Sequence, residues 1–125
     1  MAEYTDYLTG KIGCTVRSPY RHVDVAGEII DESMYNFLVR GDGKMCLCNK
    51  VGIWVSQKSC KKAKIKKGDR KSLYKLVPVG KEAVVYTINA RVSGTLRHVD
   101  SFLVVVETGE EEYVIHKDLI LAICW

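Results

Sequence analysis

Short runs of apolar residues, separated by turn-forming residues, recur along most of the chain. The runs are rich in Val, Ile and Leu, and none extends into the 3.6-residue period of an amphipathic helix. The pattern therefore predicts an all-β protein of short strands. We expect strands over residues 12–17, 25–30, 34–39, 45–48, 53–55, 83–97, 102–108, 113–116 and 119–123. Short helical segments are expected over residues 2–8 and 72–76.

The two strand-rich segments indicate an internal repeat with an offset of 67 residues, which needs no gap between residues 27 and 55. The offset aligns Gly27 with Gly94, Tyr35 with Phe102, Val39 with Val106, Lys50 with Lys117 and Ile53 with Ile120. We therefore predict two small five-stranded barrels, over residues 1–57 and 73–125, joined by a linker over residues 58–72. A barrel of this size buries only ~60% of its unfolded surface, so a neighbouring barrel would stabilise it.

The positive charge of the chain is concentrated in one central segment. The net charge is +4, yet positions 56–75 alone hold nine basic residues and one acidic residue, and both flanking segments are slightly acidic. A dense basic run attracts phosphates without sequence specificity. The alternative is a solvated linker between the barrels. The candidate phosphate contacts in this segment are Lys61, Lys62, Lys64, Lys66, Lys67 and Arg70.

The five cysteines form no Cys-x-x-Cys pair. The N-terminal residues lack the basic and apolar stretches of a secretory signal, and the longest apolar run is far shorter than the ~20 residues of a membrane-spanning helix. We therefore expect reduced structural thiols, a cytoplasmic location and no membrane association. Cys46 and Cys48 would share one face of a strand, which makes a poor zinc clip, so no metal site is expected.

Sequence signatures of catalysis are missing. The chain has no Gly-rich phosphate loop, no nucleophile elbow and no His-x-x-x-His metal pair. The adjacent Asp31 and Glu32 would point to opposite faces of a strand and so would not form a catalytic dyad. We expect no enzymatic activity, no catalytic residue and no cofactor.

The second half contains two motifs that resemble those of Sm-like proteins. Residues 94–106 read Gly-Thr-Leu-Arg-His-Val-Asp-Ser-Phe-Leu-Val-Val-Val, and residues 113–120 read Tyr-Val-Ile-His-Lys-Asp-Leu-Ile. They are most similar to the bacterial Hfq members, which carry Lys-His where this chain has His116 and Lys117. Standard Sm proteins carry Asn late in the first motif and Arg-Gly in the second. Here Val104 and Lys117-Asp118 stand in those places, a departure from the usual uridine pocket.

The first half resembles the same fold more loosely. Residues 8–16 are similar to its entry strand, and residues 27–39 also resemble the Sm-like barrel of the archaeal ribonuclease P protein subunit, with Tyr35 as an insertion. The resemblance implies two tandem Sm-like barrels that assemble into a homo-oligomeric ring and bind RNA, most readily single-stranded RNA. Three chains would supply six barrels.

The resemblance also implies where RNA would bind. Proteins read single-stranded RNA by stacking its bases on aromatic rings and by bonding to splayed bases. Phe102 would be the stacking platform and Tyr35 its counterpart in the first half, whereas the alternative for Phe102 is a place in the core. The other candidate contacts are Asn49, Lys50, Ser101, His116 and Lys117.

Two further functions stay open from the sequence. One is a protein subunit of a ribonucleoprotein of the ribonuclease P type, which predicts a monomer in isolation. The other is a structural or protein-interaction ring that does not bind nucleic acid, which predicts a buried Phe102.

Overall fold

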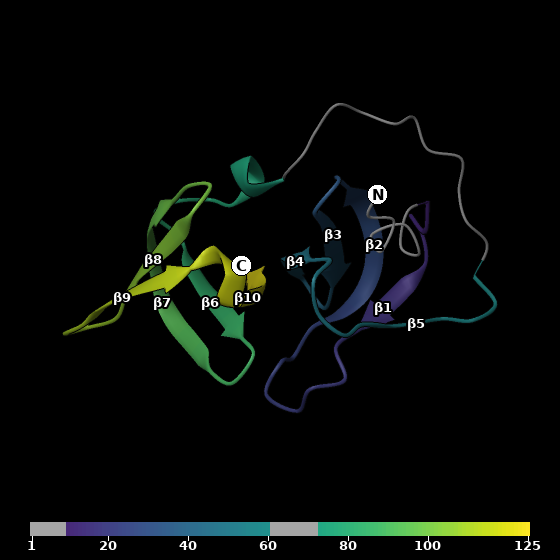
Figure 1. Ribbon diagram of the computed structural model, residues 1–125, viewed down its shortest axis with the longest axis horizontal. Helices are drawn as coiled ribbons and strands as arrows, with labels where there is room; N and C mark the ends of the chain where they lie inside the picture. The colour runs from purple at the N-terminus through teal and green to yellow at the C-terminus, as the bar shows by residue number, and fades with distance from the viewer. Residues whose placement is uncertain (1–9, 61–72) are drawn as a thin grey trace.

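The computed structural model describes residues 10–60 and 73–125 and is an all-β protein, as the sequence predicts (Figure 1). Strands of the first half are β1 (Thr15–Arg17), β2 (Ala26–Glu32), β3 (Asn36–Gly41), β4 (Lys44–Asn49) and β5 (Val55–Ser56). Those of the second half are β6 (Glu82–Thr87), β7 (Arg91–Val99), β8 (Leu103–Glu107), β9 (Glu112–His116) and β10 (Ile120–Cys124). The predicted turn between β3 and β4 is present, with positive φ at Asp42 and Gly43.

All ten strands belong to one antiparallel sheet, in the order β5-β1-β2-β3-β4-β10-β6-β7-β8-β9. Each half has the same internal order, because its fifth strand lies beside its first: β5 pairs with β1, and β10 pairs with β6. The halves meet where β4 pairs with β10, near the centre of Figure 1. We call this strand pair the joint. The sheet therefore ends at β5 on one side and at β9 on the other. The finer expectation, two Sm-like barrels, stays a prediction.

Backbone contacts recur at the 67-residue offset expected from the sequence. Three hydrogen bonds have counterparts in the other half: Gly13 N to Ile29 O with Gly80 N to Leu96 O, Ser33 N to Asn36 O with Asp100 N to Leu103 O, and Lys50 N to Tyr35 O with Lys117 N to Phe102 O. A bulge follows Ile29 in the β2–β3 pair, and the equivalent bulge follows Leu96 in the β7–β8 pair. The two halves thus share turns and bulges as well as strand order.

Apolar side chains of both halves pack against the joint. The core of the second half takes in Leu38 and Leu47 from the first. The core of the first half takes in Tyr86, Leu121 and Ala122 from the second. The joint therefore lies between two buried clusters, each built from both halves, and burial of this kind is the main force that holds the halves together.

The expected long strand over residues 83–97 is wrong, because the chain reverses there to form the hairpin of β6 and β7. Thr87 stabilises the reversal: its backbone N donates to Ala90 O at 2.8 Å, and its Oγ1 accepts from Ala90 N at 3.0 Å. The helix expected over residues 2–8 lies outside the described residues. In place of the helical segment expected over residues 72–76, the structure has a single 3-10 turn, η2 (Tyr74–Leu76). Within residues 10–60 and 73–125, no helix is long and apolar enough to cross a membrane.

The expectation of five free thiols is also wrong. Disulfides join Cys14 to Cys60 and Cys46 to Cys124, and Cys48 is buried as a free thiol. The pairing of β4 with β10 places Cys46 directly opposite Cys124, a neighbourhood that spacing along the chain does not reveal. The cytoplasmic location, which rested partly on reduced thiols, stays a prediction.

Candidate functional site

Phe102 lies in solvent on a turn whose backbone is held firmly. Its side chain is 71% exposed, the most of any large hydrophobic residue in the described part of the chain. The carboxylate of Asp100 accepts hydrogen bonds from the backbone N of Phe102 at 2.6 Å and of Leu103 at 2.9 Å. Phe102 therefore does not belong to the core, and its ring is presented from an ordered turn between β7 and β8, with the exposed Ser101 beside it.

Asp100 is itself oriented by a histidine. His98 Nε2 lies 2.6 Å from Asp100 Oδ2. This hydrogen bond, together with those from the backbone of Phe102 and Leu103, lowers the pKa of Asp100 from 3.8 to about 2. The carboxylate is thus charged at neutral pH, and it braces the turn.

The end of β9 lies against the same turn. Lys117, the first residue of η3 (Lys117–Leu119), donates its backbone N to Phe102 O at 2.9 Å, and His116 pairs with Leu103 across β8 and β9. His116 is exposed, and its Nδ1 accepts from Asp118 N at 3.3 Å. The structure therefore brings Phe102, Ser101, His116 and Lys117 together, and we call these four residues the Phe102 cluster.

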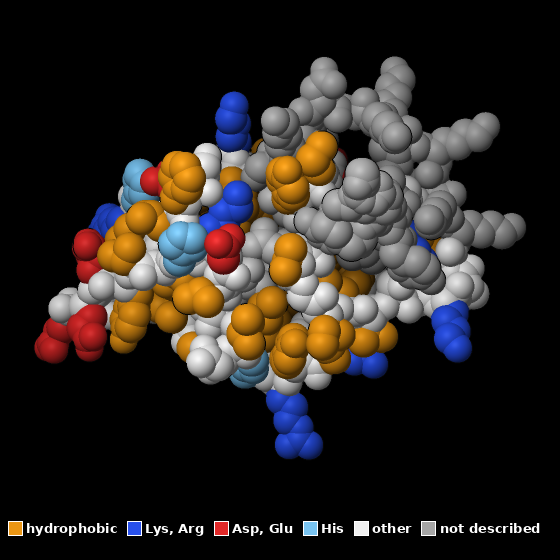
Figure 2. All heavy atoms as spheres, viewed as in Figure 1, with side chains coloured by type: hydrophobic (Ala, Val, Ile, Leu, Met, Phe, Trp, Pro, Cys, Tyr) orange, Lys and Arg blue, Asp and Glu red, His pale blue; other side chains and the backbone are white. Residues whose placement is uncertain are grey.

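The ammonium of Lys117 has an aromatic partner. Its Nζ lies 5.6 Å from the centre of the Tyr74 ring, within range of a cation–π interaction. Figure 2 shows hydrophobic, histidine and charged side chains intermixed on the side of the second half. An exposed ring beside an imidazole and an ammonium can stack on a planar group and bind an anion next to it.

The equivalent turn of the first half carries Tyr35, which is 44% exposed. Here the neighbouring lysine is not free. Lys50 Nζ lies 3.0 Å from Glu32 Oε2, and the two side chains are only 4% and 8% exposed. The other oxygen of Glu32 accepts from Gly10 N at 2.9 Å. Lys50 is thus the cation of a buried ion pair and does not face solvent as the sequence led us to expect.

Asn49 likewise holds the fold together. Its Nδ2 donates to Tyr74 Oη at 3.0 Å and to Ile120 O at 2.7 Å, and its backbone O accepts from Trp54 Nε1 at 2.9 Å. We therefore leave Asn49 and Lys50 out of the proposed interface. No sequence signal marked Tyr74 as their neighbour, because it comes from a distant part of the chain.

The basic candidates Lys61, Lys62, Lys64, Lys66, Lys67 and Arg70 lie outside the described residues. Of the two described residues nearest this segment, Cys60 forms the disulfide with Cys14 in the first half. Leu73 is buried in the core of the second half, and its backbone N donates to Asn36 Oδ1 of the first half at 2.8 Å.

Within residues 10–60 and 73–125, no group of three or more His, Cys, Asp or Glu side chains lies close enough together to hold a metal ion. His98 and Tyr74 are the neighbours of the Phe102 cluster that sequence reasoning missed. His98 stands two residues before Asp100. That spacing places two side chains on one face of a strand and was a usable signal.

These features define an all-β protein of two five-strand halves with one strand order, which carries an exposed aromatic ring on equivalent turns. By sequence the chain belongs to the family of a domain of unknown function, DUF5607, whose model matches residues 7–72. A second domain of unknown function, DUF5608, matches residues 72–125. No curated protein matches the chain.

Proposed function

We propose that this protein binds single-stranded RNA, as a tandem Sm-like protein, and that the Phe102 cluster is its main contact. The observation that carries the proposal is the 71% exposure of Phe102 on a turn braced by Asp100. A large apolar ring in solvent adds nothing to the core, so it is poised to stack on a ligand. Each base stacked on such a ring contributes ~1–3 kcal/mol to binding.

The polar neighbours of Phe102 fit the same ligand. Lys117 supplies a positive charge for a phosphate, His116 can stack or donate a hydrogen bond, and Ser101 can bond to a base or sugar. The basic residues of positions 61–71 would add a salt-dependent attraction for the RNA backbone. Tyr35 would give a weaker second contact, because it is less exposed and its neighbouring lysine is neutralised by Glu32.

Ring formation is the second part of the proposal, and the joint supports it. Within the chain, the fourth strand of the first half (β4) pairs with the fifth strand of the second (β10). The strands at the two ends of the sheet are the complementary ones, β9 as a fourth strand and β5 as a fifth. A second chain could therefore repeat the joint by pairing its β5 with β9. Such a head-to-tail contact closes into a ring when the rotation fits, and three chains would give six halves.

Fluorescence anisotropy tests the RNA-binding proposal. Labelled oligo-U, oligo-A and a structured RNA would be titrated at two salt concentrations with the wild-type chain, Phe102→Ala and Ile88→Ala. Ile88 is a matched control, since it is 55% exposed on the turn at the opposite end of β7.

We expect single strands to bind, with an affinity that falls steeply with salt and is ~1–3 kcal/mol weaker in Phe102→Ala only. Preference for the structured RNA by a monomeric chain would instead favour the ribonuclease P type of subunit. If no RNA binds even at low salt, the proposal fails and a protein-interaction role becomes the better hypothesis.

A further inference from the structure

One end of the joint is closed by a covalent bond. Met45 and Trp125 exchange both backbone hydrogen bonds, at 3.0 and 2.8 Å. The next pair along the strands is therefore a non-hydrogen-bonded pair, the kind in which facing residues come closest. Cys46 and Cys124 occupy it, with their Cα atoms 4.0 Å apart, and form the disulfide.

The other end of the joint has no covalent bond and is held by hydrogen bonds and apolar packing. There Asn49 donates to Ile120 O, and its amide also bonds to the hydroxyl of Tyr74. Between the two ends, the pairs of β4 and β10 residues lie between the two buried clusters. Breaking the disulfide would thus release one end of the joint while the other end and the core still hold the halves together.

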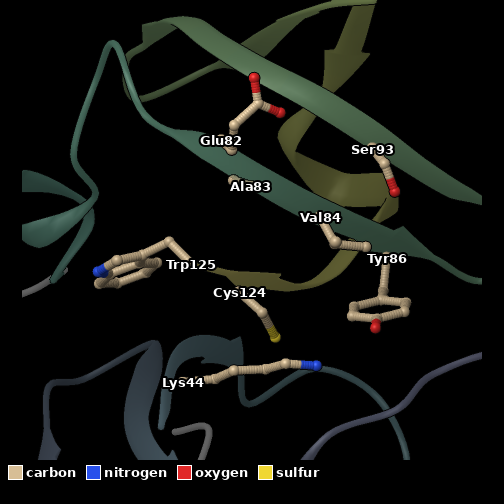
Figure 3. A pocket seen from close by; sticks show the side chains of 8 residues that line it. All are labelled: Lys44, Glu82, Ala83, Val84, Tyr86, Ser93, Cys124 and Trp125. Carbon is tan, nitrogen blue, oxygen red and sulfur yellow. The ribbon is translucent and has the colours of Figure 1, made fainter.

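A groove of about 230 Å³ opens beside the covalent end (Figure 3). Its lining includes Cys124, Trp125, Val84 and Lys44. Figure 3 shows the sulfur of Cys124 on the side of the groove where the Lys44 side chain lies. The Lys44 ammonium is paired with the Asp24 carboxylate at 4.0 Å, so what this groove offers a small thiol is an approach to Cys124.

We propose that the Cys46–Cys124 disulfide is a redox-controlled clasp on the joint. When it is oxidised, the two halves are fixed to each other at both ends of the β4–β10 pair. When it is reduced by a dithiol, the Met45–Trp125 end opens locally and the halves can move about the Asn49 end. The proposal does not depend on RNA binding.

The chemistry is thiol–disulfide exchange with a dithiol reductant. A thiolate of the dithiol attacks Cys124 Sγ, the S–S bond breaks, and Cys46 leaves as a thiolate that takes a proton from water. The second thiol of the reductant, after losing its proton, attacks its partner sulfur in the mixed disulfide and releases Cys124 as a thiolate, which is protonated in turn. The protein gains two electrons and two protons, and the dithiol leaves as a disulfide.

The other cysteines supply internal controls. Cys48 is fully buried, and burial raises the pKa of its thiol well above the usual value, which makes it a poor nucleophile. The Cys14–Cys60 disulfide lies within the first half and does not cross the joint. Its reduction should leave the joint unchanged.

The test combines alkylation mapping with amide hydrogen exchange on the full chain, equilibrated with oxidised and reduced dithiothreitol under native conditions. Mass spectrometry would report which cysteines are free. We expect reduction of Cys46–Cys124 to speed exchange at the amides of Met45 and Trp125 by about tenfold or more, while the amides of β8 keep their protection.

Variants separate the two disulfides. Cys46→Val with Cys124→Val should exchange at Met45 and Trp125 like the reduced protein, whatever the redox condition. Cys14→Ala with Cys60→Ala should still respond to the dithiol. If a variant does not fold, the wild-type mapping decides alone. The proposal is overturned if Cys46–Cys124 resists reduction in the native chain, if its reduction leaves Met45 and Trp125 unchanged, or if β8 loses protection at the same time.

Discussion

The turns that carry Tyr35 and Phe102 have the same backbone hydrogen bonds but are stabilised by different side chains. In the first half, Ser33 Oγ accepts from Asn36 N at 3.2 Å, and both side chains are buried. In the second half, the equivalent position is Asp100, an exposed carboxylate held by His98. A neutral buried network ties one turn into the core, whereas a charged brace at the surface keeps the other turn ordered and leaves its aromatic ring in water.

The lysines beside these turns differ in the same way. Lys50 is neutralised inside the protein by Glu32, whereas Lys117 is half-buried with its ammonium over the ring of Tyr74. The same arrangement of strands therefore carries a buried, paired lysine in the first half and a lysine over an aromatic ring beside an exposed phenylalanine in the second. Because the halves carry equivalent residues at the 67-residue offset, each half serves as a control for substitutions in the other.

The largest expected difference is in stability. Lys50→Met would leave the Glu32 carboxylate buried without its cation and should lower the free energy of unfolding by about 3–5 kcal/mol. Lys117→Met would lose only a cation–π contact, about 0.5–1 kcal/mol. Urea unfolding followed by circular dichroism measures both. Equal losses would show that the two lysines are not specialised as described.

The glycines at the repeat should behave alike. A Cβ at Gly27 would lie 2.4 Å from the carbonyl oxygen of Arg40, and a Cβ at Gly94 would lie 2.4 Å from that of Glu107. Gly27→Ala and Gly94→Ala should each destabilise the protein by about 1–3 kcal/mol, because the neighbouring strand must move away. Thermal unfolding of both variants, beside Gly109→Ala where a Cβ meets open space, tests this symmetry. A loss in only one half would argue against it.

The aromatic rings should contribute unequally to RNA binding. Tyr35→Ala is expected to weaken the binding of oligo-U by less than 1 kcal/mol, below the ~1–3 kcal/mol expected for Phe102→Ala. The reason is the smaller exposure of Tyr35, 44% against 71%. Titration of both variants under the same salt conditions gives the ratio. A larger loss of affinity in Tyr35→Ala than in Phe102→Ala would indicate that the main RNA contact lies in the first half.

The smallest expected difference appears at acidic pH. Because the pKa of Asp100 is lowered from 3.8 to about 2 in the folded protein, its carboxylate stabilises the turn fully above pH 3.8. This contribution is lost as the pH falls through about 2. Ser33 does not titrate, so its turn should not change. NMR titration of the equivalent amides of Leu103 and Asn36, which donate to Asp100 and Ser33, would show a midpoint near 2 for the first and none for the second. If the amide signals of both turns shifted with the same midpoint, the proposed difference between the Asp100 and Ser33 turns would be wrong.

The sequence was most informative where local chemistry decides structure. Val-, Ile- and Leu-rich runs predicted the strands, and Gly41 to Lys44 predicted a turn that the structure has. The 67-residue offset matched backbone hydrogen bonds and bulges that recur in both halves. It could do so because turns and bulges are set by residues close together in the sequence. The break at residues 88–90 was missed, since Ile88-Asn89-Ala90 contains neither Gly nor Pro and Thr87 forms the reversal through its own side chain.

Contacts between distant strands could not be read from the sequence. The joint places Cys46 opposite Cys124, and the hydrogen bond between Asn49 and Tyr74 likewise joins residues far apart in the sequence. The burial of Lys50 against Glu32 depends in the same way on how the first half folds. For the candidate site, the resemblance to the Sm-like motifs selected Phe102, His116 and Lys117, but whether each side chain faces solvent required the fold.

Photo-crosslinking of the wild-type chain to oligo-U, followed by mass spectrometry of the peptides, tests the central claim most directly. We predict adducts at Phe102 first and at Tyr35 to a lesser extent, and we expect Asp100→Ala, which frees the turn, to reduce the Phe102 adduct. Adducts confined to the first half, or no adduct at saturating RNA, would contradict the account of the Phe102 cluster as the RNA contact.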